Sequence, residues 1–316
     1  MKANKILKIA GIGLLASFGM LVSALLVTNW RFPMQSYGRL VFADTFSDGN
    51  DVDKIEIMSD GSLVTLEHNG EYWYVKEADD YHTNIVLLNN ILLNFNNATY
   101  YAKRKFSAEL QKELGLSENG VRIKTFAKDK KLNDIVVGQQ AKNKNFWYIK
   151  PFDKNEIWLV DGNFLLPREF YSWIMQPVLE FPEDMVKAIK SEGEEIRRPV
   201  PRAGFVGSDN LPVPIVSILK VANYILAENV KKIDNFDKAT YSKHKKIEFL
   251  MFGGLIITYD IYSDGESFWM TIDLKSIPLP KKEVNAYIKA NKLFYDGWIF
   301  KLPDVIGGAL FEASLK

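Results

Sequence analysis

The feature that most constrains this chain is an uncharged apolar run over residues 9–30. A helix rises about 1.5 Å per residue, so this run reaches roughly 33 Å, enough to cross a hydrocarbon core of about 30 Å. Trp30 ends the run at the depth where aromatic side chains favour the lipid–water boundary. The run therefore predicts a transmembrane helix whose partner is the lipid bilayer.

Charges on either side of the run predict its orientation. Lys2, Lys5 and Lys8 precede it, and Arg31 follows it at once. Because positive charge is retained on the cytoplasmic side, residues 1–8 are expected to form a cytoplasmic tail. We predict a single-pass signal anchor in the inner (cytoplasmic) membrane, with the soluble part periplasmic or extracellular.

Two alternatives to a retained anchor stay open. A cleaved signal peptide has an apolar core of about 7–15 residues and then a small-x-small site. Here the apolar core is longer, and residues 25–27 continue it past the small pair Ser23-Ala24. A buried core helix is the other alternative, which the length of the run and its lack of a polar face disfavour.

Composition excludes several classes of function. The chain contains no cysteine, which excludes disulfides, thiolate metal sites and a cysteine nucleophile. Its formal net charge is +1, whereas a nucleic-acid-binding protein usually carries a strong basic excess on one domain. We therefore expect no nucleic-acid partner.

Residue patterns after position 53 predict alternating strands and helices. Asp60-Gly61 and Asn69-Gly70 are turn pairs that join strands in a meander. Apolar residues at three-to-four spacing from Ile85 to Phe95 indicate a helix with one buried face. The strands are expected at 55–58, 63–67, 72–76, 121–127, 134–138, 145–150 and 156–160, and further helices at 107–116 and near Leu166-Pro167.

The second half of the chain repeats the pattern of the first. A strand at Ile123 leads to Trp147 as a strand at Ile247 leads to Trp269, and helices at 85–106 and 215–236 precede them. A Trp strand then runs toward a proline-started helix in both halves, from Trp158 to Pro167 and from Trp298 to Pro303. The second half inserts a helix at 281–291. Similar elements in the same order favour an internal duplication.

These patterns predict an α+β fold of two repeated modules, each a mostly antiparallel sheet with helices packed on one face, preceded by one transmembrane helix. The predicted domains are a tail (1–8), a membrane helix (9–30), a lead-in linker (31–53), a first module (54–191), a linker (192–214) and a second module (215–316). Proline-rich residues 192–214 are read as this linker or as an extended edge strand.

Several short segments resemble the bacterial domain-of-unknown-function family 4340. They are Glu71-Tyr-Trp73-Tyr-Val, Ala78-Asp-Asp, residues 87–95, Leu114-Gly115-Leu116, Val136-Val137-Gly138 and Gly297-Trp298. The resemblance covers about residues 54–310 and implies a membrane-anchored extracytoplasmic envelope protein without an established activity. Some members are encoded near transport or gliding-type ABC systems, which implies a membrane protein complex as a partner.

Histidines offer few candidates for chemistry. His68 and His244 are expected to be solvated surface residues. His82 follows Asp79 and Asp80, which suits either a divalent metal or, as we favour, a solvated acidic helix start. Residues 48–53 fit a polar loop better than a calcium loop, because Val52 and Asp53 break the required pattern. We predict no catalytic, cofactor-binding or metal-binding residues and no cofactor.

Five tryptophans occupy comparable places in the strand pattern, and we interpret them as core residues rather than a ligand platform. They are Trp73, Trp147, Trp158, Trp269 and Trp298. We therefore predict a non-enzymatic binding or scaffold component of a membrane complex, which the family resemblance implies is associated with an ABC transporter. The alternative is an extracytoplasmic ligand-binding module or a hydrolase that acts on envelope polymers.

Overall fold

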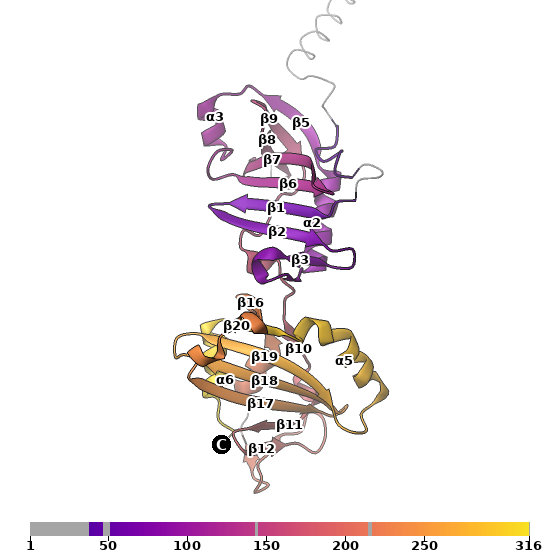
Figure 1. Ribbon diagram of the computed structural model, residues 1–316, viewed down its shortest axis with the longest axis vertical. Coiled ribbons are helices and arrows are strands. Elements are labelled where there is room, and N and C mark those ends of the chain that lie inside the picture. Colours follow the sequence, from indigo (N-terminus) through magenta and orange to yellow (C-terminus); the bar gives the residue numbers. More distant parts are fainter. Residues whose placement is uncertain (1–37, 47–50, 143–144, 214–216, 316) are drawn as a thin grey trace, which may run out of the picture. The chain divides into compact units, whose positions relative to one another are not determined.

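The computed structural model describes residues 38–46, 51–142, 145–213 and 217–315 (Figure 1). The described chain divides into two compact units. The first contains the described residues up to Thr65 together with Val86–Arg168. The second contains Leu66–Ile85 and the described residues from Glu169 onward.

Nine strands form the first large sheet, in the order β4-β3-β2-β1-β6-β7-β8-β9-β5. Its pairings from β1 to β6 and on through β7, β8, β9 and β5 are antiparallel. The strands are β1 (Lys54–Ser59), β2 (Ser62–His68), β3 (Trp73–Val75), β4 (Tyr81–His82), β5 (Thr99–Arg104), β6 (Val121–Ala127), β7 (Lys130–Gln140), β8 (Phe146–Pro151) and β9 (Ile157–Asp161). Helices α2 (Ile85–Asn97) and α3 (Ala108–Glu113) belong to the same half of the sequence.

The second large sheet also has nine strands, in the order β14-β13-β12-β11-β17-β18-β19-β20-β16. The strands are β11 (Val186–Ser191), β12 (Glu194–Arg197), β13 (Phe205–Val206), β14 (Pro212–Val213), β16 (Asn229–Lys232), β17 (Lys243–Met251), β18 (Leu255–Ser263), β19 (Phe268–Ser276) and β20 (Trp298–Leu302). A separate two-stranded sheet pairs β10 (Leu179–Glu180) with β15 (Tyr224–Ile225). The helices here are α4 (Ser217–Ala222), α5 (Lys282–Tyr295) and α6 (Asp304–Glu312).

The two large sheets follow the same strand order. Strands β1 to β4 correspond to β11 to β14, strand β5 corresponds to β16, and strands β6 to β9 correspond to β17 to β20. The residues that carry the sequence repeat lie on corresponding strands, with Trp147 on β8 and Trp269 on β19. Helix α5 is the insertion, between β19 and β20. The strand topology therefore has the internal symmetry that a duplication produces.

Local signals account for several elements. Asp60 and Gly61, which join β1 to β2, both have positive φ, as a tight hairpin turn requires. Helix α3 begins after Ser107, whose side chain accepts a hydrogen bond from the backbone N–H of Leu110. Helix α6 begins directly after Pro303. Proline is common at the start of a helix, because the N–H groups there have no partner within the helix and proline has no N–H.

The proline-rich segment 192–214 contributes β12, β13 and β14, which form one end of the second sheet. Arg198 anchors this segment, because its buried guanidinium donates hydrogen bonds to the backbone carbonyls of Val186 and Glu183 and stacks on Phe205. Burial lowers the pKa of Arg198. The guanidinium thus ties Arg198, which follows β12, to the backbone at Glu183 and Val186.

A long helix predicted for residues 215–236 is largely absent from the described part of that range. Helix α4 ends at Ala222, and β15 and β16 follow it. Their hydrogen-bonding partners are β10 and β20, which are distant in sequence. Pairing with distant strands overrides the local helical periodicity here.

The predicted layer of helices on one face of each sheet is wrong. In the described residues the helices are few and form no such layer, and antiparallel strands dominate. Irregular segments supply core side chains instead, as Phe42 stacks on Phe95 with ring centroids 4.5 Å apart and Phe164 lies 5.9 Å from Phe95. Phe42 and Phe164, which lie outside helices and strands, thus pack against Phe95 of α2.

The predicted location as a single-pass protein of the inner membrane also needs correction. Within the ranges that the structure describes, none of the helices combines the length and the apolar character needed to cross a membrane. The longest of them, α5, has 14 residues, whereas a crossing takes about 20. The helix predicted for residues 9–30 lies outside the described residues.

Candidate functional site

His82 on β4 lies among aromatic rings. Its ring centroid is 4.9 Å from that of Phe294, 5.2 Å from that of Tyr72 and 5.8 Å from that of Tyr81. Burial lowers the pKa of His82 below its ordinary value of 6.5, because the charged imidazolium loses solvation. The imidazole is therefore held neutral in an apolar setting.

The acidic residues beside His82 have structural partners. Asp79 accepts hydrogen bonds from the backbone N–H of Lys232 at 3.0 Å and from the side-chain amide of Asn235 at 2.9 Å. Asp80 forms an ion pair with Lys76 at 3.1 Å. These carboxylates are thus occupied by cationic and amide groups, and the described residues contain no group of three potential metal ligands.

The other two histidines differ in environment. His244 is exposed and contacts the carboxylate of Asp260 at 3.0 Å. His68 is half-buried, with its ring 5.4 Å from that of Trp73. The polar loop at 48–53 is described only from Asp51, and Asp53 accepts a hydrogen bond from the backbone N–H of Lys128.

None of the five tryptophans is fully exposed. Trp158 and Trp269 are buried, and the other three are half-buried. Trp269 belongs to a core cluster with Phe236 and Ile299. The ring of Trp147 lies 6.3 Å from that of Phe164. These positions are those of packing residues more than of an open stacking platform.

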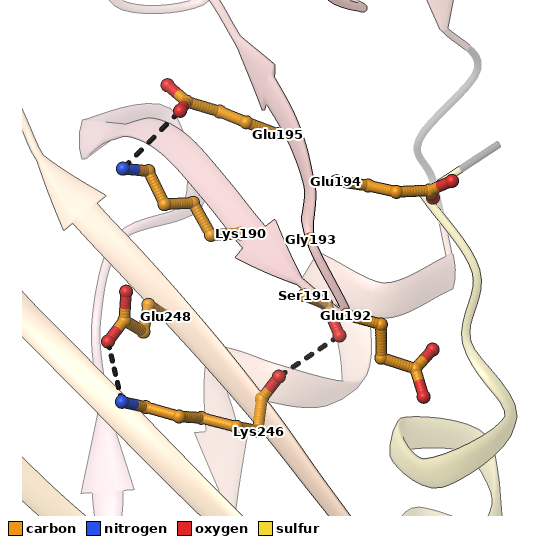
Figure 2. Close-up of a pocket in the computed structure, with 8 residues that line it drawn as sticks. All are labelled: Lys190, Ser191, Glu192, Gly193, Glu194, Glu195, Lys246 and Glu248. Atoms are coloured by element: carbon orange, nitrogen blue, oxygen red, sulfur yellow. Dashed lines mark hydrogen bonds and ion pairs between the residues drawn. The ribbon is translucent and has the colours of Figure 1, made fainter.

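A shallow hollow lies where β11, β12 and β17 meet, and Figure 2 shows the side chains that line it. Two ion pairs cross its surface, Lys190–Glu195 at 3.4 Å and Lys246–Glu248 at 3.0 Å. The hydrogen bond to Glu248 raises the pKa of Lys246, so this amine stays protonated. The two ion pairs are solvated, and the hydroxyl of Ser191 at the same hollow donates a hydrogen bond to the backbone carbonyl of Lys246 at 3.1 Å.

A second polar hollow in the first unit surrounds Asp134 on β7. Arg122 holds the Asp134 carboxylate with two hydrogen bonds of 2.8 Å, and Lys131 adds a third at 2.7 Å. Burial alone would raise the pKa of Asp134, but the hydrogen bonds from Arg122 and Lys131 outweigh it, and the pKa lies below its ordinary value. The carboxylate is a permanent acceptor and no proton donor.

Both outer strands of the first sheet are covered by backbone. Residues 38–41, which precede β1, pair with the chain at the start of β5. The backbone N–H of Gly38 donates to the carbonyl of Tyr100, and that of Val41 donates to the carbonyl of Ala98. On β4, His82 accepts a backbone hydrogen bond from Met175, and Asn84 N–H donates to Trp173. These contacts occupy outward-facing backbone groups at the start of β5 and on β4, with which another strand would otherwise pair.

The outer strands of the second sheet are protected in a different way. On β16 the backbone N–H of Lys232 donates to Asp79, and that of Val230 donates to the side chain of Asn229. Strand β14 consists of Pro212 and Val213, and proline has no N–H. Because the edges of both large sheets are protected, any partner protein is expected to contact side-chain surfaces.

One side-chain surface stands apart in its chemistry, and we call it the α2 stripe. It consists of Val86, Asn90, Leu93 and Asn97, all exposed on α2. Val86 is 68% exposed and Leu93 58% exposed. Helix α2 contains no charged residue at all. Exposed apolar side chains without neighbouring charges are typical of protein interfaces.

The buried face of α2 was predictable from its apolar spacing, whereas the α2 stripe was not predicted. Leu88, Ile91 and Phe95 are buried as predicted, whereas Ile85 is half exposed. The available signal was the absence of charge, since a solvated helix normally carries charged side chains opposite its core face.

In the part of the chain that the structure describes, the fold comprises two topologically equivalent large sheets, and helix α2 exposes an uncharged surface. The family model described as "Domain of unknown function (DUF4340)" matches residues 73–204, from β3 to the segment after β12, which confirms the family resemblance there. No curated protein matches the chain, and no solved structure does.

Proposed function

We propose that this protein is a non-enzymatic binding or scaffold component of a protein complex. The observation that carries the proposal is the α2 stripe, which exposes large apolar side chains on a helix without charge. Burying such a surface against a partner removes apolar area from water and desolvates no charge. The candidate partner implied by the family resemblance is a complex of an ABC-type transport system.

The paired charges elsewhere support the same proposal. Asp134, Glu248 and Asp79 each have a hydrogen-bonding or ion-pair partner that stabilises the charged form or the local fold. Catalytic acids and bases usually have pKa values shifted toward the operating pH, and the shift of Asp134 runs in the opposite direction.

The test is affinity capture of the tagged full chain after crosslinking in cells. The stripe variant Val86→Lys/Leu93→Lys places two charges on the α2 stripe. The control variant Val305→Lys/Leu279→Lys makes the same two changes at residues that are 85% and 90% exposed. We expect wild type and control to capture the same proteins, and the stripe variant to recover them at least tenfold less well. Equal capture by both variants would contradict the proposal.

A further inference from the structure

Four of the exposed residues of α2 have the spacing of the seam of a two-stranded coiled coil. Val86, Asn90, Leu93 and Asn97 are separated by four, three and four positions. This spacing corresponds to alternating d and a positions of a heptad, with apolar side chains at d and asparagine at a. The opposite side of the helix, with Leu88, Ile91 and Phe95, is buried in the protein itself. The stripe is therefore a second seam, which the protein's own core leaves uncovered.

Asparagine at an a position has a known physical consequence. It costs stability relative to an apolar residue, but it favours a two-stranded pairing in one register, because a facing amide satisfies it. An amide both donates and accepts, so asparagine is its own complement. Five asparagines in α2 are poor for helix propensity, which points to a role outside the helix itself.

The absence of charge on α2 restricts which surface can bind the α2 stripe. The positions flanking it, among them Asn89, Asn94 and Asn96, are uncharged as well. A charged partner surface would lose solvation there without gaining a counter-charge. The complementary surface is thus an uncharged helix with an apolar and amide seam, and α2 of a second copy has this chemistry at every position.

We propose that α2 is a homodimerisation helix, which pairs in parallel with α2 of a second copy so that Asn90 faces Asn90 across a twofold axis. This inference rests on the proposed function and names the partner at the same surface. In a twofold-symmetric pairing, each contact between two different residues occurs twice, which is the usual arrangement in homodimers. Helix α2 is about 20 Å long, so the contact is smaller than a standard interface and the dimer is expected to be weak and reversible.

Sedimentation velocity of the purified full chain over a concentration series tests this proposal. We expect a reversible dimer, a dissociation constant at least tenfold higher for Val86→Lys/Leu93→Lys, and no change for Val305→Lys/Leu279→Lys. Asn90→Leu should dimerise more tightly, because it removes the buried amide. Circular dichroism and thermal unfolding show that each variant is folded.

Two outcomes overturn the inference. One is a wild-type chain that stays monomeric throughout the series, and the other is a folded stripe variant that dimerises as well as wild type. If the chain is monomeric but the stripe variant still loses its partners in cells, the proposed function survives and the second copy is excluded as the occupant. Loss of both dimer and captured partners supports both proposals.

Discussion

The carboxylate of Asp79 accepts the backbone N–H of Lys232 at 3.0 Å, and this contact occupies a ladder group on the outer strand of the second sheet. Asp79 has a left-handed backbone, with φ of 54°, which directs it into a tight turn before β4. One acidic residue thereby protects a sheet edge. Such protection is expected where recognition uses side-chain faces instead of strand addition.

Asp79→Gly removes the hydrogen bonds of the Asp79 carboxylate but keeps the backbone conformation, because glycine adopts positive φ without strain. We expect the amide of Lys232 to exchange with solvent faster and the free energy of unfolding to fall by about 1 kcal/mol. Asp79→Asn keeps an acceptor oxygen and serves as the control. Hydrogen exchange and urea unfolding measure the two effects, and unchanged exchange at Lys232 in Asp79→Gly would show that this edge contact is unimportant.

Two neighbouring glycines in α6 should respond in opposite ways to alanine. A Cβ on Gly307 would lie 2.3 Å from the Cβ of Phe268, whereas a Cβ on Gly308 would have its nearest neighbour at 3.8 Å. Gly307→Ala should destabilise the protein by about 1–3 kcal/mol through overpacking. Gly308→Ala should stabilise it by up to about 1 kcal/mol through helix propensity. Thermal unfolding of both variants measures the two changes in stability. Stabilisation by Gly307→Ala would contradict the close contact between Gly307 and Phe268.

Protonation of the Asp134 carboxylate should lower the stability of the protein in acid. Its folded pKa is below the ordinary value of 3.8, so its stabilising contribution is complete above that pH and is lost as pH falls through the folded pKa. Asp134→Asn should therefore show a smaller decrease in unfolding free energy between about pH 5 and pH 2 than wild type. Asp51→Asn, at an exposed position, is the control. Parallel pH profiles for wild type and Asp134→Asn would be inconsistent with the ion pair.

Strands and hairpins in the first half were largely predictable because their signals are local. The strand predicted at 121–127 is β6 with the same bounds, and the turn pair Asp60-Gly61 joins β1 to β2. Helices that begin at a cap or a proline, such as α3 after Ser107 and α6 after Pro303, were also marked in the sequence.

Features that depend on distant partners could not be predicted. Strand β16 pairs with β20 across a long sequence separation, and its residues read as helix. Phe42 and Phe164 enter the core from irregular segments, for which no periodicity exists. The α2 stripe was missed because periodicity analysis searches for one buried face, and α2 has a second apolar seam.

His82 should titrate below the ordinary histidine value. Burial among Tyr72, Tyr81 and Phe294 disfavours the imidazolium, so the unfolded chain binds a proton more readily than the folded one. Stability should accordingly fall as pH decreases from 6.5 through the folded pKa. His82→Phe should flatten this part of the stability profile. An NMR titration that finds the His82 pKa above 6.5 would contradict the assignment.

Because the chain contains no cysteine, an introduced thiol can test the pairing of α2 with α2. In Asn90→Cys, the only thiol of each chain should meet its counterpart at the twofold axis and form an intermolecular disulfide. Under mild oxidation we predict a disulfide-linked dimer of Asn90→Cys and none of the control Val305→Cys, which is equally placed on an exposed helix. Equal crosslinking of the two variants, or none in either, would contradict the pairing.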